Sequence, residues 1–176
     1  MYIRKRTAII LIILGIDPGY AIVGYGVIEK TNSGTRAIDY GVITTHKDER
    51  MCDRLAKIAD ALEIIIDKYK PDCFALEELF FQNNQKTAIN VAMARGVTLL
   101  VADKKLGSDR LFEYTPLQIK QALTGNGRAE KQQVQYMVKA ILNLKSIPKP
   151  DDAADALAVA LCHGQTNLVL SGTRIK

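Results

Sequence analysis

The stretch ILGIDPGY, Ile13 to Tyr20, ends an apolar run in a carboxylate, Asp17, and a Pro-Gly turn follows at once. The apolar run from Ala8 to Ile16 is far shorter than the roughly 20 residues that a membrane-spanning helix needs. No small-residue cleavage site of a signal peptide follows it. The run therefore predicts a buried β-strand that carries Asp17 at its end.

Around this strand the sequence predicts an α/β protein with a mixed five-stranded sheet flanked by helices. Two β-rich segments, Ile22–Glu29 and Ala37–Thr45, are joined by the turn-like Thr31–Gly34 and predict an antiparallel start to the sheet. Apolar residues three and four apart predict an amphipathic helix over Asp48–Lys70, and this crossover makes the next apolar strand, Cys73–Glu78, parallel to an earlier one. The remaining expected elements are a helix over Gln85–Leu106, a strand over Leu111–Tyr114, a helix from Pro116 to Leu123 with Thr115 and Gln118 as a capping box, a helix from Lys131 to about Leu142 and a final helix over Asp151–His163.

The composition is typical of a soluble globular protein, with 48% apolar and 24% charged residues among 176. We expect one domain over residues 1–164, with a basic N-terminal extension over 1–8, and a tail over 165–176. A net charge of +5 points to a polyanionic partner, although a modest excess of lysine is also common on soluble surfaces. The three cysteines are odd in number and far apart, which favours reduced thiols of a cytoplasmic protein over a zinc site.

Carboxylates are expected to gather at one edge of this sheet. Asp17 and Glu77 each end a predicted strand, and if the two strands are parallel both side chains emerge at the same edge. Either Asp151 or Asp152 shares a face of the final helix with Asp155, because i,i+4 and i,i+3 pairs both do. Taken singly, Asp17 is also typical of a turn, and Asp151 or Asp152 of a helix N-terminus. Together they predict a metal site.

The energetic reason is charge repulsion. Two unit charges about 4 Å apart repel by about 4 kcal/mol at an effective dielectric constant near 20, so converging carboxylates are unfavourable without cations. Hard oxygen ligands suit Mg²⁺, with Mn²⁺ as a substitute, and two such ions about 3.5–4 Å apart promote phosphodiester hydrolysis.

Five stretches spread over nearly the whole chain carry a family resemblance. They are GIDPG at Gly15–Gly19, LEELFF at Leu76–Phe81, ARG at Ala94–Gly96, PLQIKQALTGNGRAEKQQVQ at Pro116–Gln135 and DAADALAVA at Asp152–Ala160. In these stretches and their order the chain resembles the RuvC family of Holliday junction resolvases, in the ribonuclease H-like superfamily. The resemblance implies a central first strand with the fourth beside it. It also implies that Asp152, not Asp151, joins Asp17, Glu77 and Asp155 as a catalytic metal ligand.

The resemblance further implies DNA contacts and partners. Phe80 matches an aromatic residue that inserts at the junction crossover, where stacking on an unpaired base contributes about 1–3 kcal/mol. Lys120 and Lys131 match lysines near the scissile phosphate, in a segment that also carries Arg128. Taken alone, Phe80 is also typical of a core aromatic residue, and each lysine of a solvated surface. The helix from Gln85 lies where the family forms a homodimer, and cooperation with the RuvA and RuvB branch-migration proteins is expected.

These observations predict an Mg²⁺-dependent endonuclease of recombination and DNA repair. It would nick two junction strands of like polarity and leave 5′-phosphate and 3′-hydroxyl ends. An ATPase of the actin and sugar-kinase type also begins with a Gly-Ile-Asp-x-Gly strand, but needs two such domains. A non-catalytic junction-binding module would explain the basic charge but not the carboxylates. Another ribonuclease H-like nuclease, acting on RNA, would share the metal chemistry.

Overall fold

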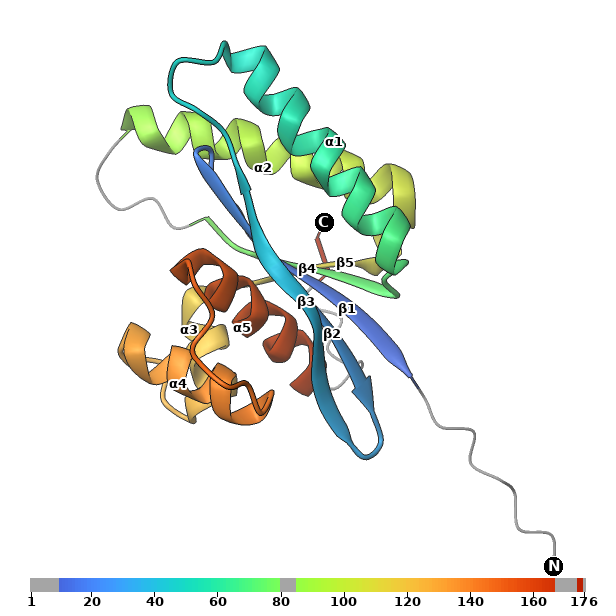
Figure 1. Ribbon diagram of the computed structural model, residues 1–176, viewed down its shortest axis with the longest axis vertical. Coiled ribbons are helices and arrows are strands. Elements are labelled where there is room, and N and C mark those ends of the chain that lie inside the picture. The colour runs from blue at the N-terminus through green and yellow to red at the C-terminus, as the bar shows by residue number, and fades with distance from the viewer. Residues whose placement is uncertain (1–9, 80–84, 167–173, 176) are drawn as a thin grey trace, which may run out of the picture.

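A five-stranded sheet in the order β3-β2-β1-β4-β5 organises the chain (Figure 1). The computed structural model describes residues 10–79, 85–166 and 174–175. The strands are β1 (Leu11–Asp17), β2 (Ile22–Thr31), β3 (Gly34–Thr44), β4 (Cys73–Glu77) and β5 (Leu111–Tyr114). β2 lies antiparallel to β1 and β3 antiparallel to β2, whereas β4 lies parallel to β1 and β5 parallel to β4. The predicted mixed sheet with three antiparallel strands and a parallel continuation is confirmed.

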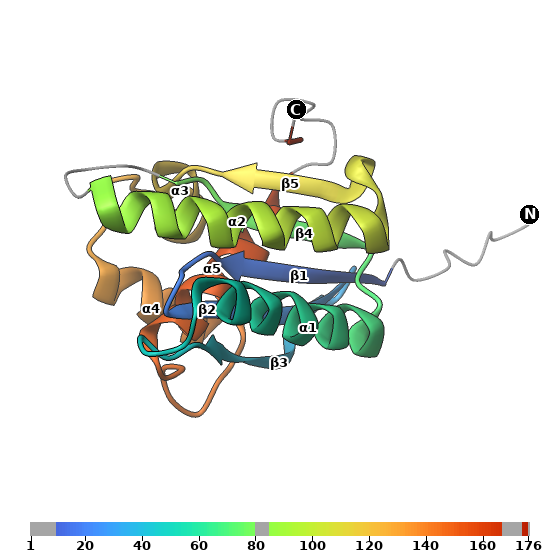
Figure 2. The ribbon, with the colours of Figure 1, turned by 90° about the horizontal axis from the view of Figure 1, so that it is seen from above.

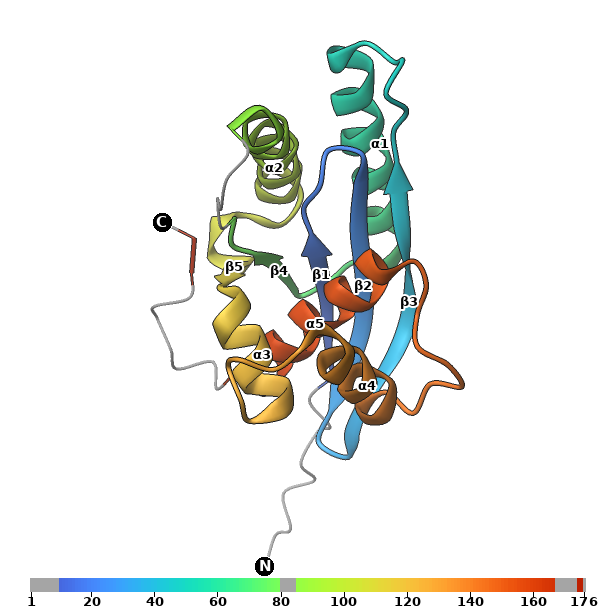
Figure 3. The ribbon, with the colours of Figure 1, turned by 90° about the vertical axis from the view of Figure 1, so that its left-hand side faces the viewer.

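Helices cover both faces of this sheet (Figures 2 and 3). The helices of the described ranges are α1 (Met51–Tyr69), α2 (Gln85–Leu106), α3 (Pro116–Thr124), α4 (Lys131–Ile141) and α5 (Asp151–Gln165), with a short 3₁₀ turn, η1, over Ser108–Arg110. α1 and α2 cover one face, and α3, α4 and α5 the other (Figure 1). The sheet is therefore the middle layer of three.

β1 is buried from both sides, because successive side chains of a strand point to opposite faces. Ile13 packs in the apolar cluster that includes α5, whereas Leu14 and Ile16 pack in the cluster beneath α1 and α2. All three side chains are 0% exposed. The strand that ends in Asp17 is consequently held by packing on each face.

α5 packs unusually close to the sheet because glycines line its path. A Cβ atom added to Gly15 would lie 2.3 Å from the carbonyl oxygen of Ala156, and one added to Gly24 would lie 2.1 Å from that of Asp152. Both distances are far inside van der Waals contact, so only glycine admits the helix at these positions. These contacts fix where the first turns of α5 lie relative to the end of β1.

Most predicted boundaries agree with the structure within a few residues. The capping box of Thr115 and Gln118 is present at the start of α3. α1 begins at Met51 rather than Asp48, because the backbone N–H of His46 donates to the Glu49 carboxylate at 2.9 Å and holds the preceding residues in a turn. β3 begins at Gly34 rather than Ala37, because strand pairing continues to the end of the hairpin.

Some expectations fall wholly or partly outside the described residues. These are the basic extension 1–8, Phe80 and much of the tail 165–176. Of that tail, Gln165 ends α5, and Arg174 forms an isolated antiparallel bridge with Phe112. The division into a domain over 1–164 and a tail stays a prediction. Among the described helices, none has both the length and the apolar character needed to cross a membrane.

Candidate active site

The parallel pairing of β1 with β4 brings two predicted carboxylates together. Ile16 is paired with Leu76. Asp17 and Glu77 are the next residues of their strands, so both lie at the same edge of the sheet. This is the carboxyl edge of the parallel strands, where α/β sheets place their sites.

The first two turns of α5 bring further carboxylates to this edge. The backbone of Asp152 lies against Gly24, on the strand beside Asp17. The charges of Asp152 and Asp155 both act on Asp17. Helical spacing does not distinguish Asp151 from Asp152, and the choice of Asp152 as a metal ligand stays a prediction, but the two side chains have different surroundings. Asp151 points to Lys149, whose ammonium donates to it at 2.7 Å, and this hydrogen bond lowers the pKa of Asp151.

Burial and mutual repulsion perturb the carboxyl groups strongly. Burial, followed by the charges of Glu77 and Asp155, raises the pKa of Asp17 to about 8. Burial, followed by the charge of Asp155, raises the pKa of Glu77 to about 7. Burial also raises the pKa of Asp155, although Lys131 opposes this shift. Desolvation and like charges are the two causes that disfavour an ionised carboxylate, and positive charge nearby relieves both.

A cavity of about 250 Å³ opens at this edge. It is lined by Glu77, Pro116, Ile119, Lys120, Lys131, Val134, Asp155 and Ala158. We call it the charged cavity. The Lys131 ammonium lies 2.8 Å from Asp155 and 3.8 Å from Asp151. Two of the predicted phosphate-binding residues, Lys120 and Lys131, thus share a cavity with two of the predicted metal ligands.

The other predicted DNA contacts lie elsewhere. Arg128 is exposed in the loop between α3 and α4 and does not line the charged cavity. Its backbone N–H donates to the side chain of Asn126 at 3.0 Å. Phe80 lies outside the described residues, so its predicted role at the crossover stays a prediction.

The donor chemistry of this edge fits a hard divalent cation. Carboxylate oxygens are the ligands that Mg²⁺ and Mn²⁺ prefer. Burial and neighbouring carboxylates raise the pKa values of Asp17 and Glu77, and a bound cation would favour their ionised forms. Within residues 10–79, 85–166 and 174–175, no three His, Cys, Asp or Glu side chains lie close enough to hold a metal ion as they stand. The carboxylates would therefore need to move their side chains to share one ion.

A group that was not predicted from the sequence holds the turn after Asp17. Arg54 of α1 is only 8% exposed, and its guanidinium lies 3.6 Å from the centre of the Tyr20 ring. It also donates to Thr45 Oγ1 at 2.8 Å and to the Tyr20 carbonyl at 3.3 Å. Thr45 Oγ1 in turn donates to the same carbonyl at 2.7 Å. The signal was the position of Arg54 four residues before Ile58, on the apolar face of α1.

A family model, curated relatives and solved structures all match this chain to the same family. The family model described as crossover junction endodeoxyribonuclease RuvC matches residues 13–163. A relative of that name from Ruminiclostridium cellulolyticum is 55% identical over 157 residues, which cover 89% of this chain and 93% of the relative. The solved structure of Thermus thermophilus RuvC has a TM-score of 0.80 at 35% identity, covering 88% of this chain and 94% of that one. The structure of T. thermophilus RuvC in complex with Holliday junction substrate has a TM-score of 0.79 at 33% identity, covering 88% and 93%.

Proposed function

Because the chain belongs to the RuvC family of crossover junction endodeoxyribonucleases, we propose that it resolves four-way DNA junctions by cutting two strands of like polarity. The observation that carries this proposal is the meeting of Asp17, Glu77 and Asp155 at one sheet edge, beside Lys120 and Lys131. A T. thermophilus relative with the same fold was solved with a Holliday junction substrate. Four-way junction DNA is accordingly the substrate that we assign.

Asp17, Glu77, Asp152 and Asp155 are the residues that would hold the metal. Their oxygen donors suit Mg²⁺, with Mn²⁺ as a substitute, and we assign two ions to each site. When bound, such a pair supplies an activated water and stabilises the leaving 3′ oxygen, which leaves 5′-phosphate and 3′-hydroxyl ends. Asp17 sits at the end of the strand that is buried on both faces, so packing holds its backbone in place.

Lys131 and Lys120 complete the charged cavity. In the structure the Lys131 ammonium forms an ion pair with Asp155 at 2.8 Å, and cations held by the carboxylates would compete with Lys131 for this partner. The lysine is then free to donate to a phosphate oxygen of the strand being cut, while Lys120 does so from the facing helix α3. Exposed Arg128 contacts the phosphate backbone of the DNA outside the cavity. Phe80 stacks on an unpaired base at the junction crossover.

A homodimer would supply the two active sites that paired nicks require. α2 presents an apolar stripe formed by Ile89, Ala92, Gly96 and Leu100, with Ile89 59% and Leu100 54% exposed. A Cβ atom at Gly96 would meet nothing within 4 Å in its own chain, so packing within the chain does not require glycine there. If α2 of a second copy crosses at Gly96, it covers the exposed apolar stripe and uses the space that the glycine leaves. A two-fold dimer also matches the near two-fold symmetry of the junction.

The dimer has its own test. Gly96→Arg should give a monomer in analytical ultracentrifugation and unpaired nicks in the junction assay. Ile64→Arg changes an apolar residue of α1 that is 67% exposed, and should leave the dimer intact. A dimeric Gly96→Arg protein would exclude this interface. We further assign the protein to the cytoplasm, with the RuvA and RuvB branch-migration proteins as its partners.

The experiment that tests the function compares a mobile four-way junction with a matched linear duplex, each with Mg²⁺ or EDTA. The proposal requires symmetric paired nicks on the junction, absent in EDTA. Binding without cutting in any metal would favour a junction-binding module instead. Equal cutting of both substrates would leave a nuclease without junction selectivity.

A further inference from the structure

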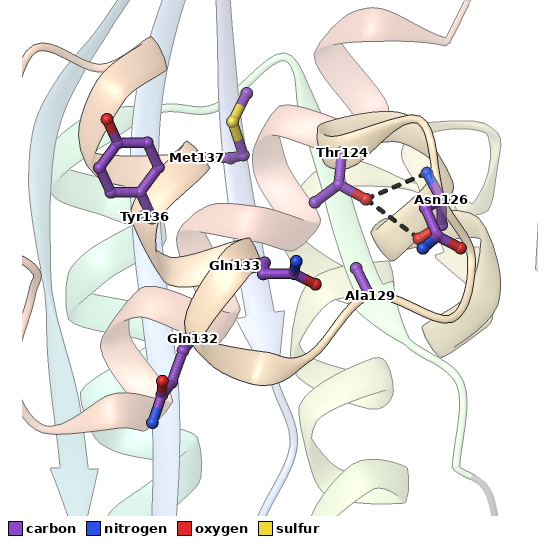
Figure 4. A pocket seen from close by; sticks show the side chains of 7 residues that line it. All are labelled: Thr124, Asn126, Ala129, Gln132, Gln133, Tyr136 and Met137. Atoms are coloured by element: carbon purple, nitrogen blue, oxygen red, sulfur yellow. Dashed lines mark hydrogen bonds between the residues drawn. The ribbon is translucent and has the colours of Figure 1, made fainter.

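A second cavity lies on the opposite side of α4 from the charged cavity. It has a volume of about 540 Å³ and is open to solvent beside the loop that joins α3 to α4. Figure 4 shows Thr124 at the end of α3 and Asn126 of that loop on one side, and Gln132, Gln133 and Tyr136 of α4 on the other. We call it the amide cavity.

The polar groups of the amide cavity are neutral, and several are available to a ligand. Among the described residues, the carboxamide of Gln132 and the hydroxyl of Tyr136 make no hydrogen bond, and both residues are exposed. The Asn126 side-chain oxygen accepts from Arg128 and the Gln133 side-chain oxygen accepts from Glu130, which leaves each amide nitrogen to donate. The cavity therefore offers donors, acceptors and an aromatic ring without a net charge.

The loop side of the cavity is held in place. The Thr124 hydroxyl accepts from the Asn126 backbone N–H at 3.1 Å (Figure 4). Its single proton is shared between the Lys120 carbonyl at 2.8 Å and the Asn126 carbonyl at 3.0 Å. Gly127 donates to the side chain of Gln121 at 3.0 Å. The floor is apolar, with Ala129 only 3% exposed. Positioned polar groups over an apolar floor are typical of a recognition site.

The position of the amide cavity relative to the charged cavity limits its ligand. Lys131 lines the charged cavity, whereas the next two residues, Gln132 and Gln133, line the amide cavity. The first turns of α4 thus separate the two, and a helix with its side chains is about 10 Å across. Consecutive nucleotides of one strand advance by about 3.4 Å, so this separation corresponds to about two to four nucleotides.

We propose that the amide cavity binds a nucleobase of the strand whose phosphate lies in the charged cavity, about two to four nucleotides from the cut. Side-chain amides recognise base edges in pairs of hydrogen bonds, and tyrosine stacks on base faces. A phosphate is disfavoured because no cationic side chain lines the cavity. The site selects the sequence that is cut, so this inference rests on the proposed junction-cutting function.

The test uses a junction library with randomised nucleotides on both sides of the crossover, cut with Mg²⁺ and sequenced at the nicks. Gln132→Ala and Tyr136→Ala should slow cutting at favoured sequences toward the rate at disfavoured ones. The ratio between the two rates should fall by about 5-fold to 150-fold, the range of one specific base contact. Gln165→Ala, an exposed glutamine at the far end of α5, is the matched control and should keep the parent preference.

Two outcomes would overturn the inference. One is a parent protein that cuts all library members at equal rates, and the other is a pair of cavity variants that keep the parent preference. If the parent cuts no junction, the proposed function fails. The base site is then judged by the affinity of the parent and the variants for oligo-dA, oligo-dC, oligo-dG and oligo-dT. The base site is supported if the parent distinguishes the four oligonucleotides and the variants do not. It is excluded if the parent binds all four with equal affinity.

Discussion

The charged cavity and the amide cavity share the first turns of α4 as a common wall but differ in chemistry. The charged cavity joins Glu77 and Asp155 to Lys120 and Lys131, whereas no ionisable group other than the Tyr136 phenol lines the amide cavity. Charge is concentrated where burial raises carboxyl pKa values and where a phosphate would be attacked. Neutral groups lie where only the identity of a base remains to be recognised. The difference separates the chemistry of cutting from the choice of sequence.

The largest effect should come from removing one charge of the carboxylate cluster. Asp17→Asn should lower the rate of junction cutting by about 1,000-fold or more, the scale of losing a preorganised electrostatic group, while junction binding persists. Gel-based cutting and binding assays on the same junction measure both. Asp60→Asn changes an exposed carboxylate of α1 and is the control. Near-normal cutting by Asp17→Asn would remove Asp17 from the site.

His163 contrasts with the groups of both cavities because it is a titratable side chain buried in the core. It is 3% exposed, its Nδ1 lies 2.7 Å from the Tyr114 hydroxyl, and burial lowers its pKa from 6.5 to about 4. Between these values the unfolded chain binds a proton at His163 that the folded protein does not. The free energy of unfolding should therefore fall as the pH drops from 6.5 toward 4, by about 3 kcal/mol in total.

Denaturant unfolding at a series of pH values measures this loss. His163→Asn should flatten the curve between pH 6.5 and pH 4, the window set by the two pKa values. His46→Gln, which changes the exposed second histidine, should keep the parent slope. An identical slope in His163→Asn would show that another group causes the pH dependence.

Lys131 tests whether the two cavities differ in their sensitivity to salt. Lys131→Gln should slow cutting by about 10-fold to 100-fold and make the slope of log affinity against log salt less steep by about 0.9, the value of one phosphate contact. Gln132→Ala in the amide cavity should leave that slope unchanged. Lys57→Gln, at an exposed surface pair with Glu49, is the charge control. Equal salt slopes for parent and Lys131→Gln would contradict the phosphate contact.

The smallest effect concerns how the turn after Asp17 is held. Arg54→Ala should lower the free energy of unfolding by about 1–3 kcal/mol, because it removes a buried cation–π contact and two hydrogen bonds. Arg54→Lys should lower the free energy of unfolding by less than Arg54→Ala does. Arg50→Ala removes an exposed pair with Asp53 and should cost less than about 1 kcal/mol. Equal losses for Arg54→Ala and Arg50→Ala would show that the buried contacts contribute little.

The parts of the fold that could be predicted from the sequence are those with a local sequence pattern. The β1 strand, the amphipathic α1 and the capping box of α3 all follow from side-chain periodicity or from hydrogen bonds between residues three apart. Such signals depend on residues close together in the chain, so they can be recognised without knowledge of the fold. The choice between Asp151 and Asp152 could not be made this way. Helical spacing puts both on a face with Asp155, and only family resemblance pointed to Asp152.

The order of the elements, the carboxylates at the strand ends and the resemblance to a nuclease family can all be recognised in the sequence. Three features emerge only in the folded chain. Burial and the charges of Glu77 and Asp155 raise the pKa of Asp17, Arg54 holds the turn after Asp17, and two unlike cavities flank α4. The physical reason is distance along the chain. The meeting of β1, β4 and α5 depends on strand register and on the close approach at Gly15 and Gly24, which no local window of sequence encodes.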